Sequence, residues 1–298
     1  MRAAEAKTKA TIKNILCLTD FSQPSEAAIP FAAAIARGYG ATVHAMHILI
    51  PAPYLYTTPE LTAAAIEAEE EHAMAEMQRI ESQLSGLRYE TIVERGTGVW
   101  AHVERAIKDR DIDLLVLGTH GRTGAEKFLL GSAAEEIFRR SPVPVLTIGP
   151  HVSSGVHSGG RFHRVLLATD FTPESVAAAP YAVSLAEENH ARLLLLHVIP
   201  SRERADCETC DLSVAEAIFQ LYELVPEEAK LERPPEVAVE YGDPAEVIVD
   251  AAKRRGADLI VVGVREAAGR VGAATHLERA TAHKIVAHAE CPVLTVRG

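Results

Sequence analysis

Short apolar runs alternate along this chain with longer stretches in which apolar residues recur at helical spacing. Continuous runs of Val, Ile and Leu are typical of strands buried in a parallel sheet, and the stretches between them are typical of amphipathic helices. In the first half the pattern predicts strands near 14–19, 42–48, 89–93, 113–117 and 144–148. The helices are expected near 24–38, 60–84, 98–109 and 132–140. This alternation predicts an α/β fold, a doubly wound parallel sheet with helices on both faces.

The same pattern occurs twice. Residues 14–22, NILCLTDFS, recur 150 positions later as RVLLATDFT, and the runs that end at Gly118 and Gly263 also match each other. Between the halves, residues 151–160 are rich in Ser and Gly and have no apolar period, which is typical of a flexible linker. We therefore expect two domains, 1–150 and 161–298, joined by the linker 151–160.

Composition and charge exclude several classes of function. The chain has 298 residues and a formal net charge of -11, whereas proteins that bind phosphate backbones carry surplus Lys and Arg. No apolar run approaches the ~18 residues of a membrane span, and residues 1–13 lack the apolar centre of a signal peptide. We expect a cytoplasmic protein whose partners include neither nucleic acid nor a membrane span.

The four cysteines are too few and too scattered for a secreted disulfide framework. Cys17 and Cys291 lie in apolar runs and are expected in the core. Cys207 and Cys210 form a CxxC pair, which can supply half of a zinc site or a redox couple. No second CxxC and no nearby His-x-x-His completes a ligand set, so the pair alone does not establish a metal site.

Two further helical stretches are predicted to pack through their apolar residues. Met74 and Met77 are expected to pack the long helix near 60–84. After Cys210, a stripe of apolar residues at helical spacing predicts the core face of a helix, and an apolar ligand pocket is the alternative. The stripe consists of Leu212, Ala215, Ile218, Phe219, Tyr222 and Val225.

The segment GTHGRTG at 118–124 directly follows an apolar run and is followed by Gly131 and Ser132. Glycines lack a Cβ, so their backbone N–H groups can approach a polyphosphate closely. Ser132 stands at the expected start of a helix, where unpaired N–H groups and the helix dipole favour an anion. The spacing predicts a phosphate-binding loop for a nucleotide, and the alternative is an ordinary turn with Ser132 as N-cap.

Asp20 ends the first predicted strand as Gly118 ends the fourth. Ligands of doubly wound sheets bind beyond the carboxyl ends of the strands, where the strand order reverses. If these strands are neighbours, the carboxylate and the loop face one crevice. The alternative for Asp20 is a turn-forming or capping residue before Ser22.

The chain contains a GxxG motif followed, after nine residues, by Gly-Ser. It also contains Thr19-Asp20-Phe21-Ser22 and a His-bearing second strand. In these features it resembles the ATP-binding form of the universal stress protein family. The duplication resembles its tandem members, and the resemblance covers essentially the whole chain. It implies a five-stranded sheet of order 3-2-1-4-5 in each domain, with the last strands of the two domains paired edge to edge. In a tandem chain this pairing can form a pseudo-dimer within one molecule, and a further homodimer stays open.

The resemblance also implies a ligand, ATP with or without a magnesium ion. Asp20 would lie by the adenine and ribose, and the backbone of Val43 would meet the adenine. The ribose and phosphates would lie along Gly118, His120, Gly121, Gly131, Ser132 and the amide of Ala133.

The second half departs from this pattern. Glu266 stands where a glycine is expected, Arg279-Ala280 replace Gly131-Ser132, and the loop 264–277 is longer. Arginines in this region could rebuild an anion site by charge, but such residues on a polar loop are more often solvated. We therefore expect a degenerate loop here and one nucleotide per chain, in the first domain.

The chain has neither a GxxxxGK[ST] loop nor an evident carboxylate pair for Mg²⁺, so we assign no catalytic residue and expect at most a slow ATPase. The favoured function is a nucleotide-dependent regulatory protein of the stress response. The alternative is a nucleotide-independent scaffold whose second domain takes a metal, lipid or protein partner. A nucleotidyl transferase is a third option, but its HIGH-like or SGGxDS-like motif is absent from the first strand.

Overall fold

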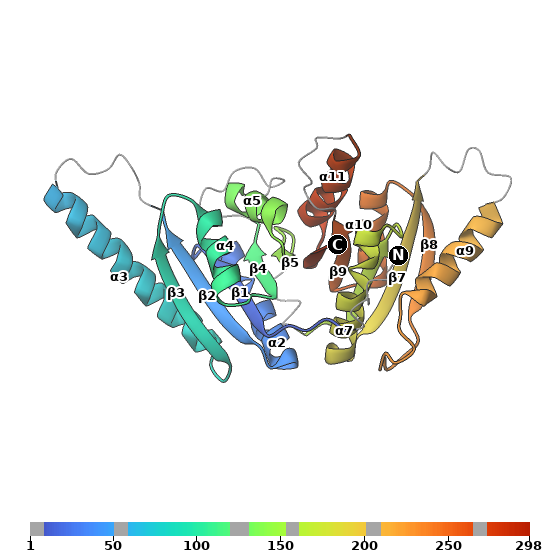
Figure 1. The fold of residues 1–298 in the computed structure, drawn as a ribbon, viewed down its shortest axis with the longest axis horizontal. Helices are drawn as coiled ribbons and strands as arrows, with labels where there is room; N and C mark the ends of the chain where they lie inside the picture. The colour runs from blue at the N-terminus through green and yellow to red at the C-terminus, as the bar shows by residue number, and fades with distance from the viewer. Residues whose placement is uncertain (1–8, 51–58, 120–130, 153–160, 201–209, 265–272) are drawn as a thin grey trace.

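A computed structural model describes residues 9–50, 59–119, 131–152, 161–200, 210–264 and 273–298. Its strands form one ten-stranded sheet in the order β3-β2-β1-β4-β5-β10-β9-β6-β7-β8 (Figure 1). The first half supplies β1 (Asn14–Thr19), β2 (Thr42–Leu49), β3 (Arg88–Arg95), β4 (Leu114–Gly118) and β5 (Val145–Ile148). The second supplies β6 (Arg164–Thr169), β7 (Arg192–Pro200), β8 (Glu236–Gly242), β9 (Leu259–Val264) and β10 (Val293–Arg297).

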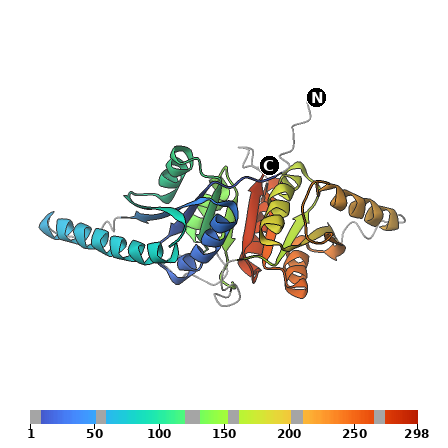
Figure 2. The same cartoon turned by 90° about the horizontal axis from the view of Figure 1, so that it is seen from below.

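The helices lie on both faces of this sheet (Figures 1 and 2). Those of the first half are α1 (Gln23–Glu26), α2 (Ile29–Tyr39), α3 (Pro59–Gln83), α4 (Val99–Asp109) and α5 (Ser132–Arg140). Those of the second are α6 (Pro173–Val176), α7 (Ala179–Asn189), α9 (Cys210–Glu223), α10 (Pro244–Arg255) and α11 (Ala273–His288). Among the described residues, none of these helices is both long enough and apolar enough to cross a membrane.

The predicted α/β fold and the strand order 3-2-1-4-5 are confirmed in the first half, and the second half repeats them. All pairings within each half are parallel. The one helix predicted over 24–38 is divided into α1 and α2. Pro30 lies at the start of α2, where its missing N–H interrupts no helical bond, so a new helix can begin there.

The two halves join through β5 and β10, which pair antiparallel with Leu146 opposite Leu294. The hydroxyl of Thr295 also donates to the carbonyl of Val145 at 3.2 Å. Because each strand covers the other's unpaired edge, neither half leaves its last strand open to another chain. The edge-to-edge pairing expected for a tandem chain is therefore present within one molecule.

The segments that precede β1 and β6 strengthen this junction. The N–H of Ala10 donates to Ser184 Oγ of α7 at 2.9 Å, although these residues belong to different halves. Phe162, which is fully buried before β6, stacks on Phe31 of α2 with ring centroids 6.2 Å apart. The halves thus share apolar packing as well as a sheet.

Helices α3 and α9 lie at opposite ends of the molecule (Figures 1 and 2). Met77 is buried as expected, but Met74 is 59 % exposed, so that part of the prediction is wrong. On α9 the buried side chains are Ala217 and Leu221, whereas Phe219 is 63 % exposed.

The predicted core face of α9 is therefore wrong for most of its members. Ala215, Ile218 and Tyr222 are also exposed, and Val225 alone of the described set packs partly against the core. Adjacent helical residues point about 100° apart, so a stripe assigned one residue off turns away from the sheet.

An ion-pair network fastens β3 to α4 at the edge of the first half. Arg110 donates two hydrogen bonds of 2.9 Å to Glu90, which also contacts His44 Nδ1 at 2.8 Å. The hydrogen bonds from Arg110 lower the pKa of Glu90 to about 2. The contact with His44 also lowers this pKa, and partial burial opposes both effects.

Candidate functional site

A cavity of about 280 Å³ lies at the carboxyl ends of β1, β2 and β4. Asp20, directly after β1, and Gly118, at the end of β4, contribute to its wall. The start of α5 closes another side. The structure thus brings together the following predicted residues: Asp20, Gly118, Gly131, Ser132 and Ala133. His120 and Gly121 lie outside the described residues.

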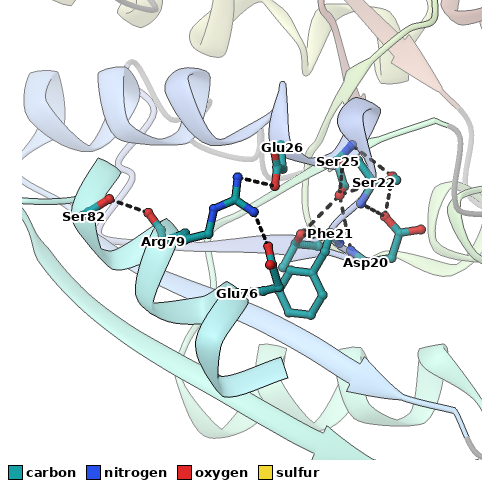
Figure 3. Close-up of polar contacts among 9 residues, drawn as sticks. Asp20, Phe21, Ser22, Ser25, Glu26, Glu76, Arg79 and Ser82 are labelled. Carbon is teal, nitrogen blue, oxygen red and sulfur yellow. Dashed lines mark hydrogen bonds and ion pairs between the residues drawn. The ribbon is translucent and has the colours of Figure 1, made fainter. Parts of the chain in front are cut away.

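Asp20 belongs to a tight turn between β1 and α1 (Figure 3). Its Oδ1 accepts hydrogen bonds from the N–H of Ser22 at 3.1 Å and from the Ser22 hydroxyl. Phe21 between them has φ 62°, a left-handed conformation that a bulky side chain rarely adopts. The turn-forming alternative for Asp20 is therefore part of its role, and the same turn presents the residue to the cavity.

Two further contacts hold this turn in place. His47 is buried on β2 and its Nδ1 lies 2.8 Å from the carbonyl of Thr19, while its ring lies 4.1 Å from that of Phe21. Figure 3 also shows Arg79 of α3 between Glu76, at 2.6 Å, and Glu26 of α1, at 4.0 Å. His47 is thus a buried histidine with a hydrogen-bond partner.

Gly118 has a packing role that the sequence reading did not assign. A Cβ added there would lie 2.4 Å from the carbonyl oxygen of Pro24, in the backbone of α1. The equivalent Gly263 is as constrained, with the carbonyl oxygen of Glu174 at 2.3 Å. Glycine at these positions is therefore required by the approach of a helix to a strand, whether or not a ligand binds.

The N-terminus of α5 opens on the cavity without a side-chain cap. The N–H of Gly131 donates to the carbonyl of Thr119 at 2.7 Å, and the first helical bond runs from the N–H of Glu135 to Gly131 at 2.8 Å. The N–H groups of residues 132–134 therefore have no acceptor within the helix. They carry the positive end of the helix dipole, which favours an anion. The N–H of Gly131 already donates to Thr119, so Gly131 contributes to the site by positioning the N–H groups that follow it.

Val43 is the predicted site residue that the structure does not bring to this cavity. It lies near the start of β2, fully buried, and pairs with Ile15 and Tyr89. Strand β2 instead lines the cavity through Met46 and Ile48, which lie nearer its carboxyl end. The general rule that ligands lie beyond the carboxyl ends of parallel strands could have selected these two from the sequence.

The structure does not place the candidate zinc ligands together. Cys207 lies outside the described residues, and Cys210 is the first residue of α9. In the parts of the chain that are described, no three His, Cys, Asp or Glu side chains gather as a metal site would require. Cys17 and Cys291 are buried as predicted, and burial raises the pKa of each thiol to about 12.

Comparisons with known proteins agree with this architecture. The chain is 27% identical over 307 residues to a universal stress protein of Mycolicibacterium smegmatis, covering 97% of this chain and 98% of that one. A universal stress protein of Methanocaldococcus jannaschii is 31% identical over 140 residues, 46% of this chain and 81% of its own. The crystal structure of a universal stress protein from Archaeoglobus fulgidus shares the fold, with a TM-score of 0.68 at 21% identity, over 97% of this chain and 98% of that one.

The model of the Universal stress protein family matches residues 11–149 and again residues 161–297. These matches span nearly all of both halves, and each contains one complete five-stranded unit of the sheet. The chain therefore belongs to the universal stress protein family, with one family unit in each half.

Proposed function

We propose that the first cavity binds ATP and that the protein acts as a nucleotide-dependent regulator of a stress response. The observation that carries this proposal is the uncapped N-terminus of α5, which opens on the same cavity as Asp20. An anionic phosphate chain suits the N–H groups of α5. The apolar walls, which include Met46 and Ile48, suit a base, and the carboxylate of Asp20 accepts hydrogen bonds from hydroxyl or amino groups.

Contacts of α5 support a regulatory role rather than simple storage of the ligand. Near its far end, Arg297 of the second half donates to the carbonyl of Phe138 at 2.6 Å. The ring of His283, on α11, lies 5.2 Å from that of Phe138. A ligand that orders the first turn of α5 therefore acts on a helix whose last turn contacts the other domain. Such a coupling requires that the two domains can adopt two relative arrangements and that these arrangements differ in affinity for ATP.

Tryptophan fluorescence offers a direct test, because Trp100 is the only tryptophan. It is buried in α4, Val99 beside it lines the cavity, and Arg140 of α5 lies over its ring at 5.0 Å. We expect ATP to change this fluorescence and to saturate at one equivalent in the first cavity.

The variant Ala133→Pro removes one N–H from the second position of α5. Proline is tolerated there, as Pro30 shows in α2. Since hydrogen bonds to charged groups contribute about 1.5–3 kcal/mol, we expect ATP to bind at least ~10-fold more weakly. Ala133→Ser, which keeps the N–H, is the matched control. Equal ATP affinity for Ala133→Pro and the wild type would show that α5 does not hold the phosphates.

We expect hydrolysis to be slow or absent, because the chain lacks a P-loop lysine. ATP turnover of about one per second or faster, lost in Asp20→Ala, would make the protein an enzyme and overturn this part of the proposal.

A second candidate function is supported by α9. Its exposed apolar side chains, Ile218, Phe219 and Tyr222, offer a surface on which a protein partner of the second domain could dock without nucleotide. The triple change of these residues to Ser would abolish such binding in a pull-down, and a partner that still binds equally well would contradict it.

A further inference from the structure

The second half contains a cavity of about 410 Å³ at the place equivalent to the first. Leu196 and Val198 of β7 stand where Met46 and Ile48 stand in β2, and Ile285 corresponds to Ile137. We propose that this cavity is a separate ligand site, selective for an unphosphorylated nucleoside and not for a nucleotide polyphosphate. The proposal does not depend on ATP binding in the first cavity.

Among the described residues, the helix end that opens on the first cavity has no counterpart in the second. The cavity is lined by Thr281 and Ala282, which correspond to Ala133 and Ala134. Helix α5 starts at Ser132, but α11 has already begun at Ala273. Backbone N–H groups near residue 281 therefore bond to carbonyls one turn earlier and cannot hold a phosphate. No lysine or arginine is among the described residues that line this cavity.

The turn that presents a carboxylate is kept. Asp170 Oδ1 accepts hydrogen bonds from Thr172 N at 3.1 Å and Thr172 Oγ1 at 2.7 Å, as Asp20 does from Ser22. Burial acts to raise the pKa of Asp170, but the hydrogen bonds from Thr172 and Ser175 outweigh it, and the pKa lies below its usual value. An ionised acceptor therefore lines the cavity at neutral pH.

The other polar residues of the lining are held by the protein itself. Glu174, at the position of Pro24, is among the residues that line the second cavity, and its Oε2 is buried. His197 Nδ1 lies 2.9 Å from the carbonyl of Thr169 and its ring lies 4.6 Å from that of Phe171, so this imidazole holds the turn as that of His47 does. The hydroxyl of Ser175 is directed elsewhere, to the carbonyl of Thr172 at 3.0 Å.

These features together define the ligand. The ionised carboxylate of Asp170 suits a molecule with hydroxyl and amino donors, and it repels a polyphosphate. The apolar walls from β7 and α11 suit the faces of a base. A nucleoside combines a donor-bearing sugar with such a base, and adenosine is the probe of choice.

The test is calorimetric titration of the full chain with adenosine in the presence of saturating ATP, which blocks the first cavity. We expect one equivalent of adenosine to bind, and Asp170→Asn to weaken it at least ~10-fold. Asp250→Asn makes the same chemical change on the exposed surface of α10 and serves as control. Thermal melting checks that Asp170→Asn and Asp250→Asn are both folded.

Absence of adenosine binding would overturn the inference, as would unchanged binding in Asp170→Asn. A second equivalent of ATP that is lost in Asp170→Asn would overturn it as well, because the cavity would then accept a polyphosphate. If ATP fails to bind at all, the function proposed for the first cavity fails, but adenosine binding that is sensitive to Asp170→Asn would still support the second site.

Discussion

Replacing Gly118 by alanine tests the close approach of α1 to β4 that positions the candidate site. The new Cβ would lie 2.4 Å from the carbonyl oxygen of Pro24 and 2.9 Å from the N–H nitrogen of Ser25. Both are backbone atoms, so no flexible side chain can rotate away. Helix α1, with the Asp20 turn before it, must move for the methyl group to fit.

The size of the effect follows from these distances. Ordinary contact begins at 3.4 Å, so α1 must shift by about 1 Å, the difference from the 2.4 Å found for Gly118. Overpacking of this kind costs ~1–3 kcal/mol, and we expect the upper end because backbone has to move. In a chain of 298 residues, about 3 kcal/mol corresponds to a fall in Tm of roughly 5 °C.

Unfolding by urea, followed through the fluorescence of Trp100, measures this loss in the half that carries the change. The control is Gly38→Ala in α2, where the added Cβ would lie 3.8 Å from the Cβ of Glu188, its nearest neighbour. Alanine is the better helix former by up to ~1 kcal/mol, so this control should be stabilising. A free energy of unfolding for Gly118→Ala within ~0.5 kcal/mol of the wild type would refute the packing role of Gly118.

Three further outcomes are expected. Glu90 has a lowered pKa of about 2 because Arg110 donates to it, so its contribution to stability is present above an unfolded pKa of about 4.5 and is lost as the pH falls toward 2. Glu90→Gln should therefore flatten the pH dependence of urea unfolding in that range. The change in the free energy of unfolding should be under ~1 kcal/mol, because the pair is partly exposed. On α9, Leu221→Ala should lower the free energy of unfolding by about 2–5 kcal/mol, whereas Phe219→Ser should change it by under ~0.5 kcal/mol, and equal losses would contradict the orientation of the helix. Cys17, with its thiol pKa raised by burial to about 12, should resist alkylation at pH 8 until the chain is unfolded in urea, and rapid labelling of the native protein would disprove its burial.

The strands and helices were predictable because their signals are local. Buried parallel strands read as continuous apolar runs, and the repeat at an offset of 150 residues identified two similar units. The division of the helix over 24–38 was also readable in principle, since Pro30 marks the first turn of α2. The orientation of α9 was not, because several apolar residues lie on its surface and periodicity alone does not tell which stripe meets the sheet.

The candidate site was predictable in part for a similar reason. Asp20 and Gly118 end their strands, and adjacent parallel strands bring their carboxyl ends to one edge of the sheet. Val43 was misplaced although its strand was predicted correctly, because the residue was carried over from the resemblance and lies at the amino end of β2, away from the cavity. The use of the Gly131 N–H by Thr119 depends on atoms from two separated elements, which no local pattern encodes.

By itself, the sequence determined the α/β fold, the duplication and the residues that end the strands, since each depends on apolar period and spacing along the chain. The tertiary structure decided that β5 and β10 close each other's edges, a pairing that the resemblance implied but that no local pattern encodes. It also decided that the backbone of α1 lies against Gly118, where a side chain would not fit. Helix α5 begins at the first cavity, whereas α11 begins several residues before the part of it that lines the second. These properties arise where segments far apart in the chain approach within a few ångströms, and there the backbone of one segment sets the chemistry available to the other.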